Sequence, residues 1–183
     1  MIYLIGGAPR VGKSILAQRL ASRLKIGWIS TDILYDVLRF KSDDAGKNEW
    51  NADPDAIAAT AEWFFPYLQR FVWGVNSMAE HYVIEGVSIL PAQAARLASE
   101  FPVRVVFLGC SNMSLERLDQ YPGHSRGYAA LPETLRHRIA FDAPQWSAFI
   151  QREAAQLGYR YVDTADAFLD RLEEAETALC PDS

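Results

Sequence analysis

The chain has 183 residues, of which 50% are hydrophobic and 22% charged, and its formal net charge is −5. This length and composition favour a single globular domain over residues 1–183. The acidic balance, with no basic run, argues against a nucleic-acid partner, and no apolar run is long enough to cross a bilayer.

The two cysteines, Cys110 and Cys180, lie far apart and show neither a disulfide framework nor metal-ligand spacing. The first residues lack the basic segment and apolar stretch of a secretory signal. We therefore expect a reducing, cytoplasmic location, with Cys110 buried as a small hydrophobic residue after an apolar strand. The three histidines form no cluster with carboxylates or cysteines, so no zinc site is expected.

The first predicted elements surround a glycine-rich loop. Residues 2–5 are predicted to form a buried strand and residues 15–21 a helix. Between them, residues 7–14 (Gly-Ala-Pro-Arg-Val-Gly-Lys-Ser) have the spacing of a phosphate-binding loop: Gly, four free positions, Gly-Lys, then Ser or Thr. This motif between a strand and a helix predicts binding of a nucleoside triphosphate. The alternative is a tight glycine turn before an ordinary helix.

Each residue type in this loop suits contact with a phosphate chain. Gly7 and Gly12 tolerate backbone angles closed to other residues and let the main chain approach a ligand. Successive amides can then form an anion-binding nest, assisted by the positive end of the helix dipole. Lys13 is expected to reach the β- and γ-phosphates, and Ser14 to ligate Mg²⁺. The predicted triphosphate contacts are Gly7, Ala8, Pro9, Arg10, Val11, Gly12, Lys13, Ser14 and Ile15.

Four more strands are predicted along the chain, at residues 26–29, 82–85, 103–108 and 159–162. Each is short, rich in β-branched or aromatic residues, and separated from the next by a helical stretch. Apolar strands that alternate with helices indicate an α/β protein with a five-stranded parallel sheet covered on both faces. With right-handed crossovers, these elements form a doubly wound, three-layer domain.

Two segments are predicted as additions to this frame. Residues 41–79, a substrate-side insertion, begin with a polar stretch and continue as a helix from about Pro54. The aromatic-rich run at residues 62–73 could wall an acceptor pocket, form a dimer face or pack in the core, so either a monomer or a homodimer is expected. Residues 119–131 are rich in turn formers and carry Arg, His and Tyr, which suits a lid, although a plain surface connection is the alternative.

Polar residues follow three of the predicted strands at their carboxyl ends, the edge at which ligands bind in open α/β sheets. Lys13 and Ser14 come after the first strand, Asp32 after the second, and Glu85 and Gly86 close the third. Because the carboxyl ends of parallel strands meet at one edge, these residues are expected to share a site.

Asp32 and Glu85 are the two carboxylates of this expected site. Asp32 is the candidate general base, or the group that orients an acceptor hydroxyl. Alternatively, residues 30–32 only cap the following helix. Glu85 is expected to hold Mg²⁺ together with Ser14, or to bind substrate beside Gly86. Its alternative role is a structural ion pair with an arginine.

Arginines are expected to supply the remaining electrostatics, because an always-ionised guanidinium suits a transferring phosphoryl group. Arg126 lies in the predicted lid and is the preferred candidate. Arg39 follows Asp32 on the same helix and could face an anionic acceptor. Arg136 and Arg138 are two positions apart on one helix and cannot both face the same side. For each of these arginines, a solvated surface position is the alternative.

Taken together, these fragments resemble the small P-loop kinases of the nucleoside-monophosphate-kinase-like group. That group includes adenylate, shikimate and gluconate kinases, chloramphenicol phosphotransferase and zeta-toxin-type kinases. Residues 6–14, 30–32 and 84–91 look most similar to its 2-phosphoglycerate-kinase-like members. The resemblance covers most of the chain in layout but is specific only at residues 6–14.

The resemblance implies a three-layer P-loop NTPase fold with strand order 2-3-1-4-5 and a lid after the fourth strand. It also implies that Arg117 stacks on adenine and that Arg126 clamps phosphate. The predicted lid holds one arginine instead of the cluster of adenylate kinases, which argues against a nucleoside monophosphate as the acceptor. By the same resemblance, the residues that line the base are Asp163, Thr164 and Ala165.

The sequence therefore predicts an ATP-dependent, Mg²⁺-dependent phosphotransferase that moves a γ-phosphate to a hydroxyl or phosphate of a small metabolite. Two other classes share its main features. One is a nucleotide-binding regulatory module that switches a protein partner, with the aromatic run as the partner surface. The other is a weak NTP hydrolase, for which no arginine finger or guanine-specificity motif is recognised.

Overall fold

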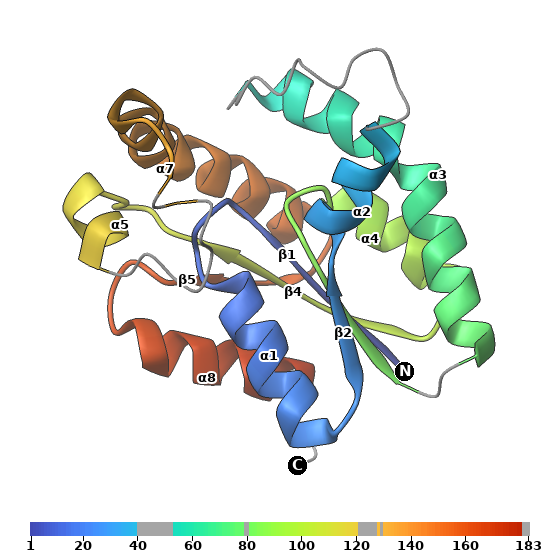
Figure 1. Cartoon of the computed structure of the whole chain (residues 1–183). Helices are drawn as coiled ribbons and strands as arrows, with labels where there is room; N and C mark the ends of the chain where they lie inside the picture. The colour runs from blue at the N-terminus through green and yellow to red at the C-terminus, as the bar shows by residue number, and fades with distance from the viewer. Residues whose placement is uncertain (40–52, 79–80, 121–127, 129, 181–183) are drawn as a thin grey trace.

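The computed structural model describes residues 1–39, 53–78, 81–120, 128 and 130–180. Its centre is a five-stranded parallel sheet in the order β2-β3-β1-β4-β5 (Figure 1). This confirms the predicted α/β class and the strand order 2-3-1-4-5. The strands are β1 (Ile2–Gly7), β2 (Gly27–Ser30), β3 (Tyr82–Glu85), β4 (Val103–Gly109) and β5 (Arg160–Asp163).

Helices cover both faces of the sheet, as predicted. On one face lie α1 (Lys13–Leu24) and α8 (Phe168–Leu179) (Figure 1). On the other lie α4 (Pro91–Ala98) and α7 (Glu133–Gln156), with α3 (Pro54–Met78) packed against α4. Because all five strands are parallel, their carboxyl ends lie together at one edge of the sheet.

Two further helices stand at that carboxyl edge. The first, α2 (Thr31–Arg39), continues directly from β2, and the second, α5 (Leu115–Gln120), follows β4. The residues predicted to carry chemistry therefore lie at strand ends and in the first turns of the helices that follow them.

β1 occupies the middle of the sheet because it carries only hydrophobic residues and glycine, and all six of its residues are buried. Its register pairs Ile5 with Glu85 of β3 and with Val106 of β4. Gly7 ends the strand with φ of 141°, and a Cβ there would lie 2.1 Å from the carbonyl oxygen of Leu108. Close packing against β4 therefore requires glycine at this position.

The second strand begins one residue later than predicted. The amide of Ile26 donates to the carbonyl oxygen of Ala21 at 3.0 Å, and Lys25 takes a left-handed φ of 56° at the C-cap of α1. The backbone of Ile26 therefore closes the helix, and pairing with β3 starts at Gly27.

The aromatic-rich run at residues 62–73 belongs to α3 and divides according to the helical period. Phe64 and Phe65 are buried in the core. Trp63 and Tyr67 are 43% and 45% exposed. Core packing is thus confirmed for one side of the run, whereas a pocket wall or a dimer face on the exposed side stays a prediction.

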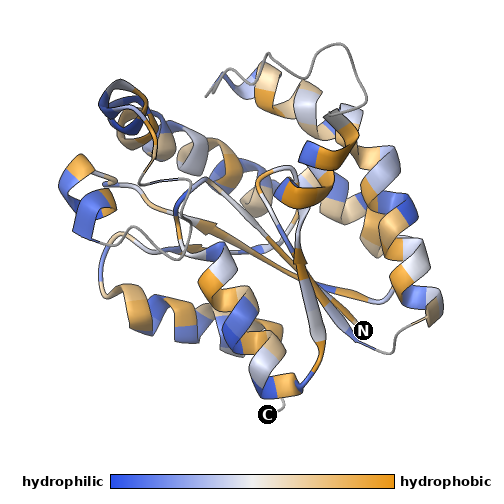
Figure 2. Cartoon of the chain, viewed as in Figure 1, coloured by the Kyte–Doolittle hydropathy of each residue, from blue (hydrophilic) through white to orange (hydrophobic). Residues whose placement is uncertain are grey.

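Hydrophobic residues gather on the sheet and on the inward sides of the helices, and hydrophilic residues lie outside (Figure 2). The helices α1 and α8 alternate between the two classes along their length, as expected for helices covering a sheet. Within the described ranges, no helix is long and apolar enough to span a membrane.

Several predicted features lie outside the described residues. These are the polar start of the insertion, the residues of the expected lid from 121 to 127, which include Arg126, and residue 129. The side chain of Arg39 is likewise outside the described part, although its backbone ends α2.

Candidate functional site

The loop between β1 and α1 has a backbone shape that favours glycine. Gly12 has φ of 99°, and Arg10 has φ of 64°, both on the positive side of the backbone map. Gly12 is also the N-cap of α1 and makes no side-chain capping bond. The first amides of α1 therefore stand beside the loop without a side-chain cap, as an anion site requires.

Lys13 lies folded over this loop. Its Nζ donates to the carbonyl oxygen of Ala8 at 2.7 Å, and the side chain is almost entirely buried. Burial lowers the pKa of Lys13, and the carboxylates of Glu85 and Asp32 oppose that shift. The ammonium group is thus held close to the loop and within electrostatic reach of both predicted carboxylates.

Ser14 and Glu85 meet at the carboxyl edge of the sheet. The Ser14 hydroxyl donates to Glu85 Oε1 at 2.9 Å, and Glu85 is only 2% exposed. Burial raises the pKa of Glu85, against the influence of Lys13 and of hydrogen bonds from Ser30 and Ser14. Within the described part of the chain these groups are its polar partners, and no arginine is among them.

A hydroxyl and a carboxylate are oxygen ligands of the kind that Mg²⁺ prefers, so Ser14 and Glu85 fit that ion. No group of three His, Cys, Asp or Glu in the described ranges could hold a metal by itself. Mg²⁺ at this pair would therefore complete its shell with water and phosphate oxygens, which is its usual mode in nucleotide sites.

Asp32 lies in the first turn of α2, and Ser30 makes the capping contact. The Asp32 amide donates to Ser30 Oγ at 3.3 Å, so the capping role predicted for residues 30–32 falls to the serine. The Asp32 side chain keeps an exposed surface, yet the surrounding protein removes enough water to raise its pKa, with Lys13 opposing the shift and Asp36 adding to it. The Asp32 carboxylate thus lies within electrostatic reach of Lys13, on the side that faces solvent.

Thr31 fixes how closely α2 approaches β3. The Thr31 side chain is 1% exposed, and a Cβ on Gly86 would lie 1.6 Å from Thr31 Oγ1. Gly86 itself is tied to β1, since its amide donates to the carbonyl oxygen of Ile5 at 3.1 Å. The missing side chain of Gly86 therefore makes room for Thr31, and this packing sets the position of Asp32 relative to Glu85.

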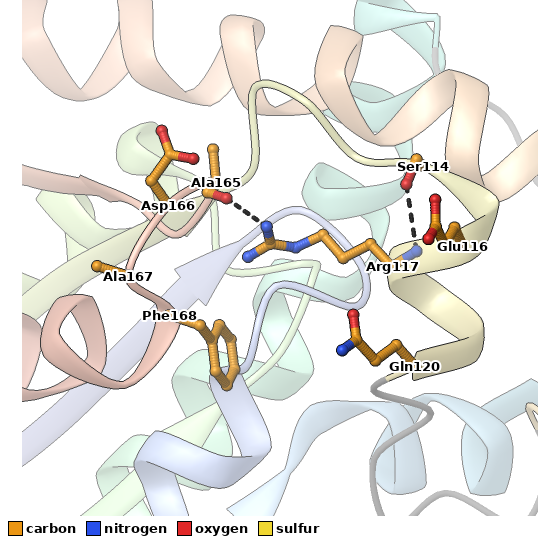
Figure 3. A pocket seen from close by; sticks show the side chains of 8 residues that line it. All are labelled: Ser114, Glu116, Arg117, Gln120, Ala165, Asp166, Ala167 and Phe168. Atoms are coloured by element: carbon orange, nitrogen blue, oxygen red, sulfur yellow. Dashed lines mark hydrogen bonds between the residues drawn. The ribbon is translucent and has the colours of Figure 1, made fainter.

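A cavity of about 470 Å³ lies between α5 and the loop that follows β5 (Figure 3). The Arg117 side chain extends across it from α5. Its guanidinium donates two hydrogen bonds, to the carbonyl oxygens of Thr164 and Ala165. The cavity is lined by Ser114, Glu116, Arg117, Gln120, Ala165, Asp166, Ala167 and Phe168.

Asp163 and Thr164 support this loop and do not line the cavity. The Asp163 carboxylate accepts hydrogen bonds from the amides of Ser111 at 3.1 Å and of Ala165 at 3.0 Å. The Thr164 hydroxyl donates to the carbonyl oxygen of Gly109 at 2.9 Å. Of the three residues expected to line a base, only Ala165 faces the cavity.

Two described residues of the predicted lid, Asp119 and Tyr128, contact each other, and Tyr128 also contacts the phosphate loop. The Arg10 guanidinium lies over the ring of Tyr128, 4.5 Å from its centre. The Tyr128 hydroxyl donates to Asp119 Oδ1 at 3.2 Å, and Arg136 donates to the same oxygen at 2.9 Å. Arg138 instead pairs within its own helix. Arg136 and Arg138 thus have different partners, as their spacing predicts.

Two solved structures share this arrangement of sheet and helices. A gluconokinase from Sinorhizobium meliloti 1021 aligns over 98% of this chain and 91% of its own, with a TM-score of 0.56 and 18% identity. A shikimate kinase from Bacteroides thetaiotaomicron aligns over 98% and 96%, with a TM-score of 0.55 and 13% identity. The chain has the fold of these kinases.

At these identities the likeness concerns the fold, and it bears out the expected P-loop kinase architecture. No protein-family model matches the sequence, and no curated protein matches it. The finer resemblance to 2-phosphoglycerate-kinase-like members stays a prediction.

The structure brings together four residues predicted from strand ends: Lys13, Ser14, Asp32 and Glu85. Six residues that line the cavity were not predicted from the sequence. They come from separate elements, and their only sequence signal is an exposed or turn-like setting. They are Ser114, Glu116, Gln120, Asp166, Ala167 and Phe168.

Proposed function

We propose that the chain is an ATP-dependent phosphotransferase that moves a γ-phosphate to a hydroxyl or phosphate of a small metabolite. The observation that carries this proposal is that Lys13, buried beside the phosphate loop, lies within electrostatic reach of the carboxylates Asp32 and Glu85. The loop and its lysine support binding of a triphosphate. An acceptor molecule additionally requires a carboxylate that it can reach from solvent, and Asp32 keeps such an exposed surface.

Each residue has a role that follows from its surroundings. The Lys13 ammonium would neutralise charge on the β- and γ-phosphates, and the loop amides would hold their oxygens. Ser14 and Glu85 would hold Mg²⁺, which supplies further charge neutralisation when bound. Asp32 would accept the proton of the acceptor hydroxyl, and its raised pKa makes it a stronger base than an ordinary aspartate.

The cavity beside Arg117 is the proposed site of the nucleotide base. Its volume of about 470 Å³ falls within the range of small-molecule sites. The hydrogen bonds to Thr164 and Ala165 fix the guanidinium where it crosses the cavity, so its flat face is available for a base to stack on.

The proposal is tested by calorimetry with ATP and Mg²⁺ and by ADP release with pooled hydroxylated metabolites. Lys13→Ala should abolish turnover and weaken ATP binding, because loss of a phosphate-stabilising cation reduces turnover by about 10³-fold or more. Asp32→Asn should abolish turnover and leave ATP affinity nearly intact, since its role concerns the acceptor. Asp55→Asn, an exposed aspartate in the first turn of α3, is the matched control and should change little.

Absence of Mg²⁺-dependent ATP affinity in the wild type would refute the proposed function. Full turnover of the Asp32→Asn variant would remove Asp32 from its role but leave nucleotide binding in place. ATP hydrolysis at the same rate with and without acceptors would favour an NTP hydrolase instead.

A further inference from the structure

One side chain, Phe168, borders both the cavity and the phosphate loop. Its ring lines the cavity below the guanidinium of Arg117 in Figure 3. The ring also packs against Gly12, because a Cβ at Gly12 would lie 2.8 Å from Phe168 Cζ and 2.9 Å from Cε2. Phe168 therefore touches the base end and the phosphate end of the proposed nucleotide site.

The start of α8 sets the position of this ring. Ala167, the N-cap of α8, has φ of 49° and ψ of 50°, a left-handed conformation that is disfavoured for a residue with a Cβ. Leu172, one turn further along α8, would lie 3.2 Å from the same added Cβ. Because α8 packs on α1 and on the sheet, both side chains are held against the loop by the fold itself.

This contact occurs at the residue on which the shape of the loop depends. Gly12 has φ of 99° and directly precedes Lys13, the first residue of α1. The Phe168 ring fills the space beside Gly12. It therefore restricts the loop backbone to a positive φ at Gly12, a conformation that favours glycine. Removal of the ring would leave the loop free to shift toward α8.

We propose that Phe168 is a positioning residue that supports the phosphate loop at Gly12 while it forms a wall of the base cavity. The inference rests on the proposed function of the site. Its particular consequence is that loss of the ring weakens binding of a bare phosphate chain, a ligand that has no base to place in the cavity.

The test compares ATP with inorganic triphosphate, each with Mg²⁺, by calorimetry. Phe168→Ala should reduce the affinity for both ligands, by about fivefold to tenfold, which is the range for loss of an aromatic contact. Phe168→Leu, which keeps apolar volume, should lose about twofold to threefold for triphosphate. Leu169→Ala is the control, because Leu169 follows Phe168 in α8 but is exposed and does not line the cavity, and its triphosphate affinity should stay within about twofold of the wild type.

Thermal unfolding of each variant establishes that it is folded at the assay temperature, and Phe168→Leu decides the question if the alanine variant is not. Triphosphate affinity unchanged in folded Phe168 variants would overturn the inference, and so would an equal loss in Leu169→Ala. A wild type that binds neither ligand would instead refute the proposed function, and the inference with it. Loss confined to the Phe168 variants supports the positioning role.

Discussion

Replacing Gly86 with alanine tests the packing that places Asp32 beside Glu85. The added Cβ would lie 1.6 Å from Thr31 Oγ1 and 2.9 Å from Thr31 Cβ, both far inside van der Waals contact. Rotation of the threonine side chain relieves only the first contact. Because Thr31 is 1% exposed, the second is relieved only if α2 moves away from β3.

The expected magnitudes follow from this geometry. Overpacking of this kind costs about 1–3 kcal/mol, so Gly86→Ala should lower the free energy of unfolding by that amount. Thr31→Ala removes a methyl group worth about 0.8 kcal/mol of burial. It also removes a buried hydroxyl that has no hydrogen-bond partner among the described residues, which is favourable, so its net effect should stay within about 1 kcal/mol.

A double-mutant cycle by urea unfolding measures the interaction. In the double variant the 1.6 Å contact is absent and the 2.9 Å contact remains. We therefore expect the free energy of unfolding lost in Gly86→Ala to be partly recovered, by about 1 kcal/mol or more. Turnover should fall in Gly86→Ala more than ATP affinity does, because Asp32 moves with α2 while the phosphate loop does not. Additivity of the two substitutions to within about 0.5 kcal/mol would show that Thr31 does not confine Gly86.

Two further predictions concern Arg117 and Glu85. Arg117→Ala should lower ATP affinity by about fivefold to tenfold and leave inorganic triphosphate affinity within about twofold, as measured by calorimetry. Equal losses for both ligands would contradict a base in the cavity. Glu85 has a pKa raised by burial, so the folded wild type holds this proton more tightly than the unfolded chain does, and stability is lost as pH rises through that pKa. Urea unfolding between about pH 4 and pH 8 should therefore show the wild type losing stability relative to Glu85→Gln, and parallel pH curves would contradict this assignment.

The sequence by itself determined the features that depend on neighbouring residues. The phosphate loop was predictable because the positive φ of Gly12 and the helix start at Lys13 are local requirements, written in one short segment. The central strands β1 and β3 were predictable because a parallel strand buried on both faces must be a nearly continuous apolar run. Their carboxyl ends then indicated Lys13, Asp32 and Glu85 without knowledge of any contact.

Only the tertiary structure decided which side chains from different elements meet. The hydrogen bond between Ser14 and Glu85 depends on the register of β1 and β3. The contact of Phe168 with Gly12 depends on how α8 packs beside the loop. The spacing of hydrophobic residues indicates which side of a helix or strand is buried, but it does not indicate which distant residue packs against that side. That choice is made by close packing of the whole core, where each side chain occupies the volume that the others leave.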